Sequence, residues 1–590
     1  MRQFFKFLFA SCLGTSIALF LLFFIFLGIG ASFASKGGTS KTTEHISANS
    51  VLHLKFDEVI PELTDNVQEA KFELDPQKTL GLHDIVASIK YAKTDDDIKG
   101  IFIEADQIQA GFTTLASIRN AIDDFKASGK FVYAYAPYYT QGAYYLASAG
   151  NKVALAPLGI VDWRGFSSTR MFFKDALERI GVHHEVFYAG KFKSASEPYR
   201  RNDMSENSKL QTHAFLDEMY RIMLEDVGNS RSITTSQLRD LANKYTGIDP
   251  QGALDGDLID ELIYREAFLE EIREEIGLDS DEKINFVKLT NYQSARVPFQ
   301  EVHGEKIAIL VAEGVIVDGK GEASKIGDKK YVKLIEKLRM DDNVKAVVLR
   351  VNSPGGSAMA SDHIWQALMD LKATGKPVVA SMGYLAASGG YYISCAADSI
   401  FAEPSTITGS IGVVSAIPQL QKMLNEKIGV HFDSVKTGPY AHGINVVFDM
   451  SEGEKALLEN RTKAMYQTFL SRVSEGRKMP IAAIDSIAQG RVWVGTTAAE
   501  IGLVDRIGDL NDAIQTAADM AGLTDYETQM YPKQASPWER MLKEIMDPEE
   551  MMKTSMMKEQ LGSLYPYYVQ YKEMTDSKGL QMRLPIVVEF

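Results

Sequence analysis

Cysteine is scarce in this chain of 590 residues, which has only Cys12 and Cys395. Two cysteines, one of them inside an apolar run, cannot form the disulfide framework of a small secreted domain or a four-cysteine zinc site. Positive charge is also in deficit, because 63 lysines and arginines face 78 aspartates and glutamates and leave a net charge of −15. Proteins that bind nucleic acid need a basic face for phosphates, so we expect no nucleic-acid partner.

Charge is absent altogether from one segment, residues 7–34, where leucine, phenylalanine and isoleucine dominate. As a helix this run spans about 42 Å, more than the ~30 Å hydrocarbon core of a membrane. A cleaved signal peptide has a shorter apolar part, although residues 32–34 (SFA) resemble a cleavage site. We therefore expect a retained signal anchor at 7–34, a cytoplasmic tail at 1–6, and the rest of the chain outside the cytoplasm.

The sequence contains an internal duplication. Four pairs of segments match in the same order, each pair 246 or 247 positions apart, which is far longer than a solenoid repeat of 20–50 residues. The pairs are 95–103 with 341–349, 124–130 with 370–376, 142–150 with 389–397, and 202–209 with 448–455.

These matches define the expected domains. We predict an N-terminal repeat domain at 50–295, a C-terminal repeat domain at 305–525, and a charged, methionine-rich tail at 526–590. With 45% hydrophobic and 24% charged residues, the chain has an ordinary globular composition, and it is long enough for more than one core.

Short apolar runs alternate with helical patterns inside each copy. In the second copy, strands are expected at 307–312, 346–351, 377–382 and 399–404, and a helix at 360–376. Strand–helix–strand alternation favours parallel pairing with right-handed crossovers, so the fold class predicted for both copies is α/β.

The two copies differ at two positions that matter for chemistry. Ser410, in the sequence TGSIG, stands opposite Trp163 of the first copy, and Lys193, in FKSASEP, stands opposite Ala441 of the second. Each copy thus keeps one member of a serine–lysine pair. This pattern is expected if an ancestral homo-oligomer shared the pair across its interface and each copy lost one half after fusion.

A serine hydroxyl becomes a good nucleophile only when a base removes its proton. Lysine can be that base if burial or a nearby cation brings its pKa from about 10.4 toward 7–8. We predict Ser410 as the nucleophile and Lys193 as the general base. Lys191 is the alternative base, because it lies two residues earlier and shares a strand face with Lys193.

Glycine-rich segments follow two of the expected strands. In RVNSPGGS (350–357), Gly355 and Gly356 allow backbone amides to face a ligand oxygen, as an oxyanion hole requires, although a tight turn would look the same. SMGYLAASGGYYIS (381–394) is given no role beyond shaping the cleft.

Two other motifs lack a residue that their binding chemistry requires. GVIVDGKG (314–321) has a glycine where a P-loop needs serine or threonine, and HEVFY (184–188) lacks the second histidine of a zinc protease. His183, His184 and His431 recur at matching positions of the repeats, which favours a structural role. We therefore expect neither a metal nor another cofactor.

Taken together, RVNSPGGS, SMGYLAASGGYYIS, TGSIGV, FKSASEP, AQGRVW (488–493) and GLVDRIGDLNDA (502–513) resemble the signal peptide peptidase A (protease IV) family in its long bacterial form. The resemblance implies a serine peptidase with a Ser–Lys dyad on two tandem crotonase-like (ClpP-like) α/β domains. By motif, it assigns Ser410 as nucleophile, Lys193 as base, and Gly355 and Gly356 to the oxyanion hole.

The same resemblance implies an anchor in the bacterial inner membrane and a homotetramer with its catalytic domains on the periplasmic side. The implied substrates are remnant signal peptides and other apolar peptides. Two alternatives remain open from sequence: an acyl-CoA enzyme of the crotonase type, and a membrane scaffold that has lost catalysis.

Overall fold

The structure is a computed structural model that describes residues 46–66, 78–297, 304–321 and 324–533, with isolated positions elsewhere that include Gln581–Arg583. The anchor expected at 7–34 lies, apart from isolated positions, outside the described residues. Within the described part, no helix is both long and apolar enough to cross a membrane.

The first repeat is built on a six-stranded sheet in which every neighbouring pair is parallel. Apolar runs form its central strands, which are buried because helices cover them, as is usual for parallel sheets. The strand order is β6 (Glu261–Leu262), β4 (Lys152–Leu155), β3 (Phe131–Ala136), β2 (Ile98–Ile103), β1 (Ser50–Leu54) and β7 (Asn285–Lys288).

The second repeat has a sheet of the same topology. Its strands pair in the order β18 (Arg506–Ile507), β14 (Ser399–Ala402), β13 (Val378–Ala387), β11 (Val344–Ser353), β8 (Lys306–Glu313) and β19 (Glu527–Tyr531), all parallel. Two further strands, β15 (Ile407–Gly409) and β17 (Val492–Val494), extend it past β13. The α/β class and the duplication are thereby confirmed.

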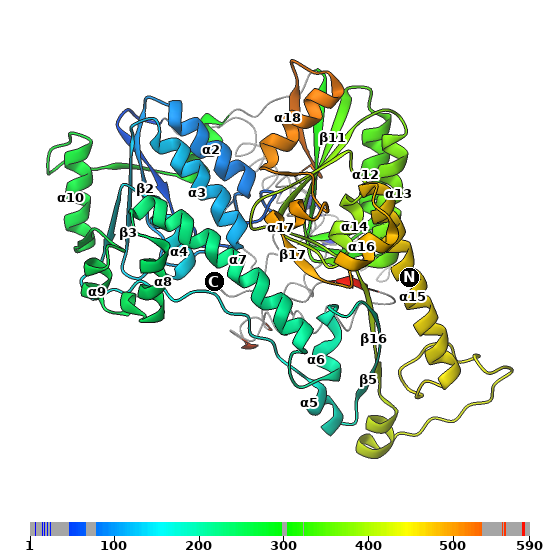
Figure 1. The fold of residues 1–590 in the computed structure, drawn as a ribbon. Coiled ribbons are helices and arrows are strands. Elements are labelled where there is room, and N and C mark those ends of the chain that lie inside the picture. The colour runs from blue at the N-terminus through cyan, green and yellow to red at the C-terminus, as the bar shows by residue number, and fades with distance from the viewer. Residues whose placement is uncertain are drawn as a thin grey trace.

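The helices also occur in matched pairs, one in each repeat (Figure 1). The pairs are α2 (Leu82–Thr94) with α12 (Asp328–Met340), α3 (Phe112–Lys126) with α13 (Ala358–Lys372), α4 (Gln141–Ala147) with α14 (Gly389–Ser394), α7 (Glu206–Arg231) with α15 (Glu452–Arg477), α8 (Thr235–Asn243) with α16 (Ile481–Ile487), α9 (Pro250–Asp255) with α17 (Gly495–Glu500), and α10 (Arg265–Glu275) with α18 (Leu510–Ala521). Helices α5 (Lys174–Arg179), α6 (Glu197–Arg200) and α11 (Leu289–Arg296) belong to the first repeat.

One repeated motif has a local structural cause. Both long helices follow the sequence DMSE, and its serine caps the helix: the Ser205 hydroxyl accepts from the Ser208 amide, and that of Ser451 accepts from the Glu454 amide. Such caps satisfy amides that have no partner inside the helix.

The element predictions for the second copy hold closely. The four expected strands correspond to β8, β11, β13 and β14, and the expected helix corresponds to α13, which begins two residues earlier. The segment expected as a tail from 526 contributes strand β19 to the second sheet, in the place that β7 takes in the first. Another strand of the same segment, β20 (Gln581–Arg583), belongs to a separate sheet.

The two repeats are joined by a shared core and by an arm from each. Ala387, Ile407, Val492 and Val494 of the second repeat lie in the main apolar cluster of the first. In the arms, β5 (His183–Ala189) pairs antiparallel with β16 (Val413–Gln419) along their whole lengths, and Figure 1 shows the two side by side below the repeats. They end a third sheet, whose order is β10 (Lys325–Gly327), β9 (Val315–Val317), β12 (Gly355–Ser357), β20, β16 and β5.

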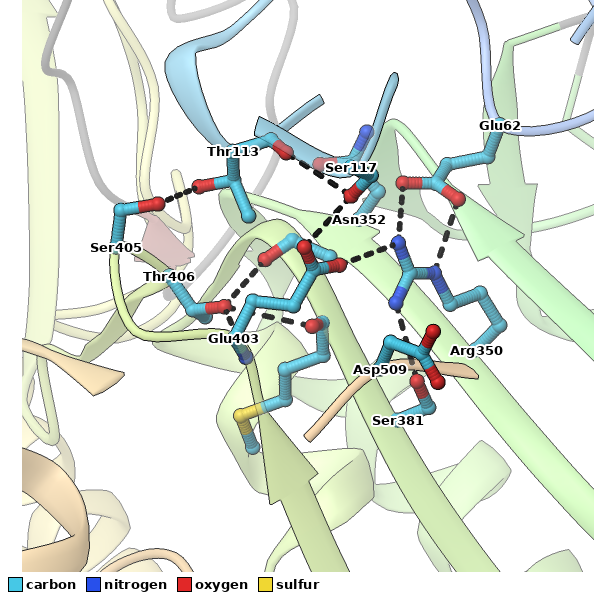
Figure 2. A network of polar contacts seen from close by, with 12 residues as sticks. Glu62, Thr113, Ser117, Arg350, Asn352, Ser381, Glu403, Ser405, Thr406 and Asp509 are labelled. Carbon is cyan, nitrogen blue, oxygen red and sulfur yellow. Dashed lines mark hydrogen bonds and ion pairs between the residues drawn. The ribbon is translucent and has the colours of Figure 1, made fainter. Parts of the chain in front are cut away.

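A buried polar network also joins the repeats (Figure 2). The Arg350 guanidinium of β11 donates from Nε and Nη2 to the Glu62 carboxylate of the first repeat, at 2.9 and 3.1 Å. It also donates to Glu403 at 3.3 Å and to Ser381 at 3.0 Å. Ser117 of the first repeat donates to Glu403 at 2.6 Å.

The charges in this network depend on one another. Burial raises the pKa of Glu403 to about 7, although the nearby charge of Arg350 favours ionisation. Burial by itself would lower the pKa of Arg350, but Glu62 and Glu403 more than offset it, and the pKa is raised. A buried guanidinium thus holds a buried acid from each repeat.

Removing that guanidinium should weaken the junction between the repeats. We expect Arg350→Met to lower the free energy of unfolding by about 3–5 kcal/mol near pH 8, since two carboxylates stay buried without their cation. The loss should shrink at pH 5, below the pKa of about 7 of Glu403, because that acid is then protonated. Urea denaturation of the wild type, this variant and the exposed-site control Arg179→Met gives the values, and an Arg350→Met curve that overlays the wild type would contradict this account.

Candidate active site

Lys193 is held at the junction by backbone contacts with the second repeat. It directly precedes a short 3₁₀ turn, Ser194–Ser196, at the end of the first arm. The neighbouring amide of Phe192 donates to the Gln489 carbonyl at 2.8 Å. A Cβ at Gly490 would lie 2.7 Å from the Lys193 Cβ, and one at Gly412 would lie 3.2 Å from its Cδ, so glycine makes room for the lysine stem.

The Lys193 ammonium nitrogen meets two serines of the second repeat. Its Nζ donates to the Ser388 hydroxyl at 2.7 Å and to the Ser410 hydroxyl at 3.1 Å, and it also contacts the Ser410 carbonyl at 3.0 Å. All three side chains are buried, with at most 2% of their surface exposed. An amine and two hydroxyls from different repeats therefore share one enclosed space.

Burial changes the acidity of the amine. Desolvation lowers the pKa of Lys193 from the usual 10.5 to about 7, because the charged form loses its hydration. A lysine with a pKa near neutrality is present partly as the free amine, which can accept a proton from a hydroxyl. Lys191, the alternative base, is exposed at the surface, with its Nζ 5.4 Å from the centre of the Phe192 ring.

Ser388 has an unusual backbone conformation. Its φ of 58° and ψ of −112° lie in a backbone region that residues other than glycine rarely adopt, and Ser388 stands immediately before helix α14. Its amide donates to the Gly409 carbonyl at 2.8 Å, which ties it to strand β15. A serine on a strained turn between a strand and a helix is the arrangement of a nucleophile elbow.

Ser410 is also in a left-handed conformation, with φ of 54°, at the end of β15. Its amide donates to the Arg491 carbonyl at 2.7 Å. The motif AQGRVW thus positions both Lys193 and Ser410. The Gln489 carbonyl accepts from the amide next to Lys193, and the Arg491 carbonyl accepts from the Ser410 amide.

The predicted oxyanion glycines lie beside Ser388. A Cβ at Gly389, the residue after Ser388, would be 3.1 Å from both the Gly355 Cα and the Gly356 amide nitrogen. The Gly355 amide donates to the Ser353 hydroxyl at 3.1 Å. The SPGG segment and the first residue of α14 therefore lie against each other, directly after Ser388 in the chain.

The structure brings Lys193 and Ser410 together, as the sequence pattern predicts, and it adds Ser388, to which the sequence analysis assigned no role. The repeat alignment contains the signal that identifies it, because Ser388 stands opposite Gln141 at the start of α4. Gln141 accepts from the Gly165 amide at 2.7 Å, and Trp163, opposite Ser410, is fully buried in the first core.

The first repeat has also lost the glycines of the SPGG segment. Gln109 and Ala110 occupy the positions of Gly355 and Gly356, at the same offset of 246 residues. Larger side chains thus replace both serines and both glycines in the first copy, which has kept only the lysine.

For metals, the described residues contain no cluster of three or more histidine, cysteine, aspartate or glutamate side chains.

The sequence matches a known peptidase family and several of its members. Peptidase family S49 matches the sequence twice, at residues 124–279 and 370–524. Protease 4 of Haemophilus influenzae is 35% identical over 85% of this chain and 83% of its own length, and Protease 4 of Salmonella typhi is 36% identical over 82% and 78%. The chloroplastic serine protease SPPA of Arabidopsis thaliana is 32% identical over 75% of this chain and 66% of its own length.

The burial of Lys193 should affect stability in a pH-dependent way. Between pH 7 and 10.5 the unfolded chain binds a proton at this lysine and the folded chain does not, so the stability of the wild type rises with pH in that window. We expect Lys193→Met to be at least as stable as the wild type at pH 7, with a difference that shrinks toward pH 10.5.

Thermal unfolding between pH 6 and 10 measures this difference. Lys191→Met is the matched control at an exposed position, and its unfolding temperature should follow that of the wild type. A Lys193→Met protein that is less stable than the wild type by the same amount at every pH would contradict the proposed desolvation.

Proposed function

Since this chain belongs to peptidase family S49 and is a serine protease, we propose that it hydrolyses peptides with a serine and a lysine drawn from different repeats. Lys193 is the general base and Ser388 is the nucleophile. The observation that carries the proposal is the 2.7 Å contact between the Lys193 Nζ and the Ser388 Oγ in a fully buried setting.

Three features favour Ser388 over Ser410, the nucleophile predicted from sequence. Its hydroxyl is nearer to the amine, at 2.7 Å against 3.1 Å. Its strained backbone and its place before α14 fit a nucleophile elbow. It also directly precedes Gly389, whose amide lies beside the SPGG segment, so an oxyanion formed at Ser388 has donors next to it.

Ser410 has a supporting role in this proposal. A neutral lysine must direct its lone pair at the Ser388 proton, and hydrogen bonds to the Ser410 hydroxyl and carbonyl hold the amine in that orientation. If Ser410 were instead the nucleophile, Ser388 would be the orienting residue. The variants described below distinguish these two assignments.

The reaction follows from these positions. Neutral Lys193 takes the Ser388 proton while the oxygen attacks the peptide carbonyl, and the resulting oxyanion is held by the amides of Gly356 and Gly389. The amide of Gly355, the other glycine predicted from sequence, donates to the Ser353 hydroxyl instead. The lysine ammonium then returns the proton to the leaving amine, which leaves an acyl-enzyme. Water, deprotonated by the same lysine, releases the acid and regenerates Ser388.

The finer features that the sequence resemblance implies remain proposals. We propose tandem crotonase-like domains, an inner-membrane anchor formed by residues 7–34, catalytic domains on the periplasmic side, and remnant signal peptides and other apolar peptides as substrates. An anchor next to the catalytic domains would keep the site near membrane-held apolar peptides.

We also propose a homotetramer, and the second arm supports a closed homo-oligomer. Residues 428–446 correspond to 180–198, the segment of the first arm that docks onto the second repeat. In this structure they expose several large apolar side chains: Ile428, Val430, Phe432, Val435, Tyr440 and Ile444. By the symmetry of the duplication, the first repeat of another copy would cover them, and head-to-tail contacts of this kind form a ring when the rotation from copy to copy closes.

Single substitutions test the assignments. With a fluorogenic apolar peptide, Ser388→Ala and Lys193→Ala should each lower kcat by about a thousandfold or more, because a nucleophile and its base act as one unit. Ser410→Ala should lose about tenfold, the value of one orienting hydrogen bond. Lys191→Ala is the control and should match the wild type. Full activity in Ser388→Ala together with no activity in Ser410→Ala would identify Ser410 as the nucleophile.

The pH dependence of the rate tests the base. Because Lys193 must be neutral and its pKa is about 7, kcat/KM should rise with pH and reach half its maximum near pH 7. Lys193→Arg should be inactive up to pH 10, since a guanidinium stays protonated in this range. A wild-type profile whose midpoint lies near pH 10 would mean that the working base is not desolvated.

A further inference from the structure

The side chain of Gln211 lies between the segment that carries Lys193 and the strand that supports Ser410. Gln211 is in the second turn of α7 and is only 1% exposed. Its Nε2 donates to the Phe192 carbonyl at 2.9 Å and to the Ser194 hydroxyl at 3.3 Å. Because these residues flank Lys193, one side chain holds the lysine segment on both sides.

The same amide group also reaches the second repeat. The Gln211 Oε1 accepts from the Val492 amide at 3.2 Å. Val492 begins β17, directly after Arg491, whose carbonyl accepts from the Ser410 amide at 2.7 Å. Gln211 therefore links the backbone around the lysine to the backbone that holds Ser410.

The partners of Gln211 require a donor and an acceptor together. A backbone carbonyl needs a donor and a backbone amide needs an acceptor, and the planar head of glutamine supplies both. A carboxylate here would place an acceptor against the Phe192 carbonyl, and a methionine would supply neither group to these buried partners. The hydrogen-bonding pattern is thus specific to an amide.

Lys193 depends on such contacts because it lies in neither a helix nor a strand. It precedes the 3₁₀ turn with φ of −72° and ψ of 80°, and its side chain crosses the junction to reach Ser388. Proton transfer requires the two groups at hydrogen-bond distance, and a misplacement of about 1 Å can lower a rate by about a hundredfold. Contacts at residues 192 and 194 restrain the peptide groups on either side of the lysine.

An arginine adds a second contact to the same segment. The Arg170 Nη1 donates to the Ser194 hydroxyl at 3.0 Å and to the Ser208 hydroxyl at 2.9 Å, and its Nη2 donates to the Thr212 hydroxyl at 3.3 Å. Ser208 and Thr212 stand on α7 on either side of Gln211 in the sequence. The residue after the lysine is thereby tied to the helix that carries Gln211.

The second repeat, which lacks the lysine, also lacks these polar side chains. At the offset of 246 residues, Leu457 and Leu458 of α15 stand opposite Gln211 and Thr212. Leu457 is exposed, and Leu458 lies in a small apolar cluster. Since α7 and α15 have the same length and the same serine cap, the helix itself does not require a glutamine at this position.

We propose that Gln211 is a positioning residue of the hydrolytic site, which fixes the Lys193 amine by holding the lysine segment against β17. This inference rests on the proposed function and adds a residue to it. Gln211 acts through Lys193 and not on the reacting atoms. Its loss should therefore lower kcat and leave KM nearly unchanged, because proton transfer is impaired and peptide binding is not.

Hydrolysis of a fluorogenic apolar peptide at pH 8 tests this role. We expect Gln211→Met to lower kcat by about tenfold or more and to keep KM within about twofold of the wild type. Gln141→Met is the matched control, because Gln141 is equally buried and its amide contacts Arg164 and Gly165 within the first repeat. The control should lose similar thermal stability and keep the wild-type kcat.

Two results of that comparison would overturn the proposal. One is a wild-type kcat in Gln211→Met, and the other is an equal loss of kcat in Gln211→Met and Gln141→Met. The second result would mean that any buried glutamine lost from the first repeat has the same effect.

Gln211→Glu provides a readout that general destabilisation does not. When protonated, the acid can donate to the Phe192 carbonyl and accept from the Val492 amide as glutamine does, whereas the carboxylate can only accept. The kcat of this variant relative to the wild type should fall by about tenfold or more between pH 5.5 and 9, with circular dichroism showing folded protein throughout. A ratio that stays constant with pH would contradict the proposal, whether or not Gln211→Met folds.

The same assay separates this inference from the proposed function. If the wild type hydrolyses the peptide, Lys193→Ala does not, and Gln211→Met keeps the wild-type kcat, the proposed function stands and the role of Gln211 is wrong. If the wild type does not hydrolyse the peptide, the proposed function is wrong and the role of Gln211 is wrong with it.

Discussion

The enclosure of one amine at the junction of the two repeats is the constraint on which the rest of this structure depends. A lysine in water is almost fully protonated at neutral pH and cannot serve as a base. Here the first arm carries Lys193 into the second repeat, where burial lowers its pKa to about 7 and two serine hydroxyls meet its nitrogen. The shared core, the paired arms and the network around Arg350 all keep that junction closed.

The duplication explains how such a junction could arise. Both repeats keep the same sheet order and the same long capped helix, so the scaffold has been preserved in each. What differs is the site: the first repeat has Gln141 and Trp163 where the second has Ser388 and Ser410, and the second has Ala441 where the first has Lys193. Since a single pair needs one amine and one hydroxyl, each copy was free to lose the half supplied by the other.

Much of this organisation could be predicted from the sequence because it depends on local patterns. Apolar runs and helical periodicity predicted strands β8, β11, β13 and β14 and helix α13, and the repeat comparison indicated that Lys193 would act away from its own repeat. Family membership then favours a peptidase over an acyl-CoA enzyme. The comparison with Trp163 drew the sequence analysis to Ser410, although the same reasoning applied to Ser388 opposite Gln141.

Two features were beyond sequence reasoning. The strained backbone of Ser388 comes from its place between β13 and α14 and has no sequence signature beyond adjacent glycines. The pairing of β20 with β12 joins residues more than two hundred positions apart, and nothing in the composition of the tail indicates it.

The central claim is that a lysine of one repeat activates Ser388 of the other, and trapping the acyl-enzyme tests it most directly. The chain would be mixed with the 4-nitrophenyl ester of an apolar acid, quenched in acid, digested, and mapped by tandem mass spectrometry. This account predicts an acyl group on Ser388 in the wild type and none at the same time point in Lys193→Met. An acyl group on Ser410 instead, or equal labelling of Ser388 without the lysine, would contradict it.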